Sequence, residues 1–182
     1  MMNTAGIESV LGSRRTPIRS LLFLSLWSVL AFSLAGVMGT SLGAWTPDVG
    51  VVLLIALVAR SRPRGLWAAA IAISAGRIAL SIEPPLAILA IYLGIAGVHS
   101  GLCGFADGNR ALVRFFGAAL YAGITVVALI ALHESRSVYD LGLLEHAPQL
   151  AMRTAASTAM CSILLSPLLS LLPGLGEWRQ QP

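Results

Sequence analysis

Six long apolar stretches, separated by short polar segments, constrain this chain of 182 residues more than any other feature. They cover about 21–40, 46–59, 66–82, 86–103, 112–132 and 154–172. A helix needs about 20 apolar residues to cross the hydrocarbon core of a bilayer. Charged residues are 11% of the chain, against roughly 25% in an average soluble domain. The pattern excludes a soluble enzyme or regulator and predicts one all-α domain over 1–182, an integral membrane bundle of six transmembrane helices.

The basic residues predict the orientation of this bundle. All twelve are arginine, so chemistry that requires a lysine is excluded. With a cytoplasmic N-terminus, nine arginines fall in inside segments and two in outside segments. Positive charge gathers on the cytoplasmic side of membrane proteins, so both termini are predicted to be cytoplasmic. Because these arginines flank apolar runs, they indicate contact with the lipid bilayer and its anionic headgroups, and no nucleic-acid partner is expected.

The first stretch is predicted to stay in the membrane as a helix. A secretory signal peptide has the same basic-then-apolar order, but its apolar core is only about 7–15 residues long. The run over 21–40 is longer than that and lacks a clear cleavage site. We therefore expect a retained helix at the start of the bundle.

The residues that could carry catalysis are few and badly placed. Cys103, Arg110 and His133 occur in the order that a membrane cysteine enzyme would use. Arg110 and His133 lie at opposite ends of the predicted fifth helix, about 35 Å apart at 1.5 Å per residue, so the three side chains cannot converge. No HExxH, CxxC or glycine-rich phosphate loop occurs. We expect no enzyme activity, no metal and no cofactor. We interpret His99 as a residue that hydrogen-bonds a neighbouring helix or faces the headgroups, rather than as a ligand.

Arg77 is the one charge within the predicted third span, and an arginine within a span costs about 2.5 kcal/mol or more unless it has a partner or a polar cavity. The basic turn between the second and third spans is centred near residue 62, with Asp48 14 residues before it and Arg77 15 after it. Both side chains should then lie at the same depth, near the outer side. We predict an Asp48–Arg77 ion pair, with Glu83 as a second candidate partner. In the alternative, Arg77 reaches the headgroups alone and Asp48 only caps its helix.

Small residues recur along two of the predicted helices. The first span carries Ala31, Ala35 and Gly39, and the fourth carries Gly94 and Gly97. In a bilayer such residues let helix backbones approach closely, so we predict that these faces contact other helices, within the chain or in a partner.

The region from the second to the fourth span resembles the MreD family, small multi-span membrane subunits of the bacterial rod-shape system. The resemblance is carried by Thr46-Pro47-Asp48-Val49, the basic turn over 60–65, the segment Ser74-Ala75-Gly76, and the run from Pro84 to Leu93. MreD-like sequences tend to carry an acidic residue after a glycine in the third span, whereas here Arg77 follows Gly76.

The resemblance implies a non-enzymatic scaffold in the bacterial inner membrane, with no catalytic residues to carry over. Its partners would be an MreC-type protein and, through it, the polymerase and transpeptidase that elongate the peptidoglycan wall. The alternative is the substrate-binding S component of an energy-coupling-factor vitamin transporter, which is also basic and six-spanning. Against it, the outer loops at 40–45 and 83–85 are short and offer no polar and aromatic cluster for a vitamin. A small lipid-modifying enzyme is a more distant alternative, because acid–base residues are lacking.

Overall fold

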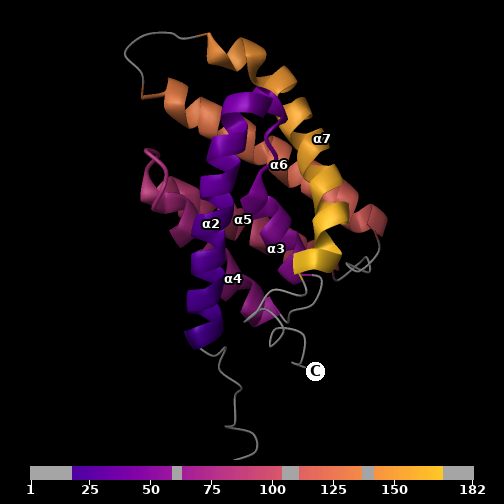
Figure 1. The fold of residues 1–182 in the computed structure, drawn as a ribbon. Helices are drawn as coiled ribbons and strands as arrows, with labels where there is room; N and C mark the ends of the chain where they lie inside the picture. Colours follow the sequence, from indigo (N-terminus) through magenta and orange to yellow (C-terminus); the bar gives the residue numbers. More distant parts are fainter. Residues whose placement is uncertain (1–17, 59–62, 104–110, 137–141, 170–182) are drawn as a thin grey trace, which may run out of the picture.

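The computed structural model describes residues 18–58, 63–103, 111–136 and 142–169, and they form helices joined by short connections (Figure 1). Among these residues there is no strand. The elements are α2 (Ile18–Leu42), the 3-10 helix η1 (Gly43–Trp45), α3 (Val49–Val58), α4 (Pro63–Ile78), α5 (Pro85–Cys103), α6 (Ala111–Glu134) and α7 (Leu143–Leu169). The predicted all-α class is confirmed for this part of the chain, and each predicted apolar stretch corresponds to one α-helix.

Within the part of the chain that the structure describes, three segments are long and apolar enough to cross a membrane. They are Leu21–Trp45, which joins most of α2 to η1, Pro85–Leu102 in α5, and Ala111–Glu134 in α6. Three such helices in one chain are typical of a multi-pass membrane protein.

The helices α3 and α4 are shorter than the predicted second and third spans. α3 has 10 residues and α4 has 16, so they are about 15 Å and 24 Å long at 1.5 Å per residue. A hydrocarbon core of about 30 Å exceeds both lengths. The chain over 46–48 is not helical and the chain over 79–84 forms turns and bends, so α3 begins later and α4 ends earlier than the predicted spans, while α4 also begins three residues earlier.

The helix α7 is longer than predicted, because it begins at Leu143 rather than near 154. Gly142 has φ +62°, which lets the chain turn sharply before the helix. The Glu134 carboxylate then accepts the N–H groups of Leu143 and Leu144 at 2.9 and 3.2 Å, so the end of α6 caps the start of α7. α7 is thus one α-helix from Leu143 to Leu169.

The core of the bundle is built around α3. Its residues 51–57 are all buried, and it contacts α2, α4, α6 and α7. Figure 1 shows α3 between α2 and α7, with α4 and α5 behind α2. A helix that is apolar on every side must be enclosed by other helices, as this one is. The short α3 is thus the centre around which the longer helices pack.

Candidate functional site

The start of α3 and the end of α4 meet beside the middle of α2. A Cβ atom on Gly76 would lie 2.5 Å from Ser28 Cβ and 3.0 Å from the Val29 backbone nitrogen, so the backbones of α4 and α2 approach as closely as glycine allows. A Cβ atom on Gly50 would lie 2.7 Å from Cζ of the Phe32 side chain. The start of α3 and the end of α4 therefore lie beside the middle of α2.

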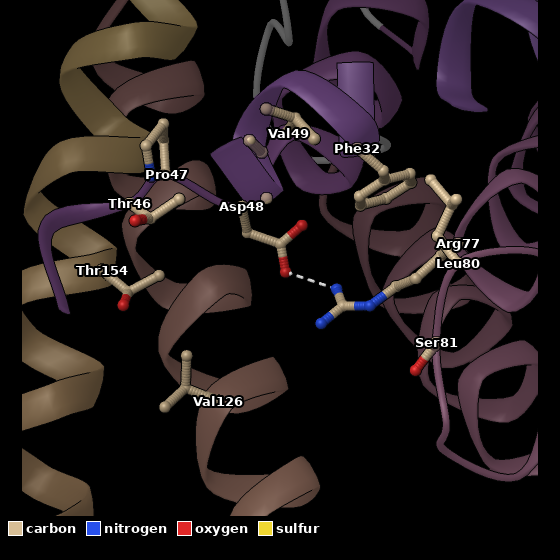
Figure 2. Close-up of a pocket in the computed structure, with 12 residues that line it drawn as sticks. Phe32, Thr46, Pro47, Asp48, Val49, Arg77, Leu80, Ser81, Val126 and Thr154 are labelled. Atoms are coloured by element: carbon tan, nitrogen blue, oxygen red, sulfur yellow. Dashed lines mark hydrogen bonds and ion pairs between the residues drawn. The ribbon is translucent and has the colours of Figure 1, made fainter. Parts of the chain in front are cut away.

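Asp48 and Arg77 are brought together at this level (Figure 2). Arg77 Nη1 donates to Asp48 Oδ2 at 2.9 Å and to the Tyr92 hydroxyl at 2.7 Å, and that hydroxyl donates to Asp48 Oδ1 at 3.1 Å. The side chains of Asp48 and Arg77 are 5% and 21% exposed. The guanidinium also lies 5.6 Å from the Phe32 ring centroid and 5.8 Å from that of Tyr92, within reach of cation–π attraction. We call Asp48, Arg77 and Tyr92 the polar cluster; it joins the start of α3 to α4 and α5.

Asp48 also caps α3. Its Oδ1 accepts the backbone N–H of Gly50 at 3.0 Å and of Val51 at 3.2 Å. Aspartate is a preferred N-cap residue, and its charge is favourable at the positive end of the helix dipole. The two alternatives weighed from the sequence, ion pair and cap, therefore coexist, because one carboxylate oxygen faces Arg77 and the other faces the helix end.

Two threonines of α7 hold the linker that precedes α3. The Asp48 N–H donates to Thr158 Oγ1 at 2.8 Å, and the Thr158 hydroxyl donates to the Thr154 carbonyl at 2.6 Å. The Thr154 hydroxyl donates to the Ala44 carbonyl at 3.1 Å. Neither these threonines nor Tyr92 was predicted from the sequence as part of this site. The signal of the two threonines was the spacing of four residues, which puts two hydroxyls on one face of an apolar helix.

A pocket of about 330 Å³ lies beside the polar cluster (Figure 2). Its walls include Ala35 and Gly36 of α2, Asp48 and Arg77, and Thr154 of α7. In Figure 2, the second terminal nitrogen of Arg77 lies below the nitrogen that bonds Asp48 and points into the space enclosed by the lining residues. Ala35, predicted as a helix contact, thus forms part of a pocket wall.

The other small residues predicted as helix contacts differ in their surroundings. A Cβ on Gly97 would lie 3.3 Å from Trp67 Cη2 of α4, and one on Gly39 would lie 3.5 Å from Thr46 Oγ1. Ala31 is partly buried and packs on the core. Gly94 is exposed, and a Cβ there would meet nothing within 4 Å in the described part of the chain. Gly97 therefore lies at a close helix contact, whereas Gly94 faces outward.

The remaining polar candidates lie away from the cluster. His99 is 2% exposed, and its Nδ1 is 3.0 Å from the Tyr121 hydroxyl of α6, so it bonds a neighbouring helix as interpreted from the sequence. Glu83 does not pair with Arg77; its Oε1 lies 3.7 Å from His133 Nδ1. Arg110 lies outside the described residues. Within the described ranges, no group of three or more His, Cys, Asp or Glu side chains could hold a metal ion.

Comparison with protein-family models, with curated proteins and with solved structures found no match to this chain.

Proposed function

We propose that this chain is a non-enzymatic scaffold subunit of the bacterial wall-elongation machinery in the inner membrane, of the MreD type. The observation that supports the proposal is that Asp48 and Arg77, two charged residues inside the bundle, are engaged in bonds between helices. Asp48 and Arg77 bond each other, Tyr92 and the start of α3, so they join helices together. A buried polar network of this kind fixes one arrangement of a bundle, which a protein acting by its shape requires. The sequence resemblance over the second to fourth spans supports the same function.

In this proposal all six helices belong to a membrane bundle with both termini in the cytoplasm. The arginines of the turn over 60–65 then mark the cytoplasmic end of the hairpin formed by α3 and α4. The polar cluster then lies at the opposite end of this hairpin from the basic turn, beside the connections before α3 and after α4.

The proposed contact with an MreC-type partner uses the outer face of α2. Leu22, Leu26, Leu30 and Leu34 follow one another at intervals of four residues and are 51–66% exposed. Ser33 and Gly36 are exposed on the same helix and would let a partner helix approach. Contacts between helix faces in the bilayer, rather than a reaction, would be the mechanism.

Affinity purification of the chain from its own bacterium in mild detergent tests the proposal. A photo-crosslinking residue at Leu34 on α2, 61% exposed, should capture an MreC-type protein. The matched control at Leu120 on α6, 53% exposed, should capture much less of it. Recovery of transporter ATPases in place of wall-elongation proteins would overturn the proposal.

The pocket favours one other function, that of a vitamin-binding S component. Its volume of about 330 Å³ falls at the lower end of the roughly 300–1,000 Å³ common for ligand pockets. A vitamin that copurifies at one molecule per chain, together with a transporter ATPase, would support this second function against the first.

A further inference from the structure

We infer that the pocket beside Arg77 binds one anionic oxygen group, a phosphate or a carboxylate, through the free edge of the guanidinium. This binding site goes beyond the scaffold function and does not depend on it.

The hydrogen bonds of the polar cluster leave some N–H donors of Arg77 without an acceptor among the described residues. A guanidinium carries five N–H donors. Arg77 uses those of Nη1, for Asp48 and Tyr92, and no residue that the structure describes accepts from Nη2 or Nε. The remaining three donors do not bond Asp48, and Figure 2 shows the second terminal nitrogen pointing into the space enclosed by the lining residues. The missing partner is an acceptor.

Asp48 does not fill this need, because its carboxylate is already engaged. Oδ1 accepts from Gly50 N, Val51 N and Tyr92 OH, and Oδ2 accepts from Arg77 Nη1. An ionised carboxylate has about four lone-pair sites. The charge of Asp48 is therefore balanced by Arg77 and by the positive end of α3. The edge of the Arg77 guanidinium formed by Nη2 and Nε keeps the fork geometry that binds a carboxylate or phosphate through two parallel hydrogen bonds.

The rest of the pocket suits a polar group. Among the hydroxyls of lining residues, those of Thr46 and Thr154 donate to the Gly43 and Ala44 carbonyls. The Ser81 hydroxyl accepts from the Glu83 N–H, so its own proton can be donated to a ligand. Gly36 and Leu80 at the edge of the pocket are exposed, so the pocket opens to the outside of the bundle. The group can come from a lipid headgroup or from a soluble anion, and the two sources share the same chemistry at Arg77.

The test uses the full chain with inorganic phosphate, acetate, and nanodiscs of phosphatidylcholine with or without phosphatidylglycerol. A soluble anion should raise the unfolding midpoint saturably by a few degrees, where chloride at equal ionic strength does not. A lipid source should instead leave one phosphatidylglycerol per chain in native mass spectra. Arg77→Lys keeps a cation beside Asp48 but lacks the fork, so it should weaken the observed binding at least tenfold.

A second variant tests the pocket without changing the cluster. Gly36 lines the pocket and a Cβ there meets nothing within 4 Å, so Gly36→Leu should obstruct it and reduce binding at least tenfold. Gly94→Leu is the matched control, because Gly94 is equally open but lies outside the pocket, and its binding should equal that of the wild type. The inference is overturned if neither anion nor phosphatidylglycerol binds, or if Gly36→Leu and Arg77→Lys bind as the wild type does.

Discussion

Replacing Asp48 by asparagine should destabilise the bundle by leaving the Arg77 charge without its counterion. Asparagine keeps a carbonyl that can accept from Gly50 and Val51, so the cap of α3 survives and the effect isolates the charge. Removing one partner of a buried pair costs about 3–5 kcal/mol. Because Arg77 is 21% exposed beside an open pocket, the cost should lie near the lower end, about 3 kcal/mol.

A loss of about 3 kcal/mol should lower the unfolding midpoint by about 6–12 °C for a chain of this size. Circular dichroism of the purified chain in detergent would measure it, with the exposed Arg153→Gln as a control for loss of a surface charge.

A double-mutant cycle with Arg77→Met then separates the pair from the packing. Methionine preserves much of the side-chain volume without the charge, so the double variant should be more stable than the sum of the two single losses predicts, by about 2 kcal/mol. Strictly additive losses, or an unchanged midpoint in Asp48→Asn, would refute the reasoning. Exchanging the two charges should rescue little, because an arginine at 48 cannot accept the amides of α3.

Three further changes test the packing around the cluster, each by the same thermal measurement. Gly50→Ala should cost about 1–3 kcal/mol, because its Cβ would overlap the buried Tyr92 ring, whereas Gly94→Ala should not destabilise, because its Cβ meets nothing; equal midpoints for the two would contradict the packing. Thr158→Val should cost about 1–3 kcal/mol by leaving the amide at 48 without an acceptor, and Thr158→Ser should restore most of the loss. Glu134→Ala should cost about 1 kcal/mol by uncapping α7, and an unchanged midpoint would show that this cap adds nothing.

The number and order of the helices followed from the sequence because apolar runs and the arginines between them mark where helices must start and stop. The Asp48–Arg77 contact followed from hairpin geometry, since two residues equally far from a turn lie at equal depth. Tyr92 and Thr158 did not follow, because their positions depend on how α5 and α7 pack against that hairpin. The packing of helices against one another cannot be predicted from the hydropathy pattern of a single sequence.

The lengths of the helices were harder to predict, for two different reasons. A hydropathy pattern does not separate an apolar residue in a helix from one in an extended linker, so α3 and α4 were taken as longer than they are. The opposite error affected α7, whose first turns are polar and begin where Glu134 supplies a cap. The capping residue, Glu134, lies nine positions before Leu143 in the chain. The residues at the start of α7 therefore contain no local capping signal that would predict where the helix begins.

Depletion of this protein in the bacterium that carries it, followed by measurement of cell width and length, tests the central claim most directly. A scaffold of wall elongation predicts that cells widen and lose their rod shape within a few generations, and that expression of the wild-type chain restores both dimensions. Cells that keep their width and length while uptake of a vitamin fails would contradict the account.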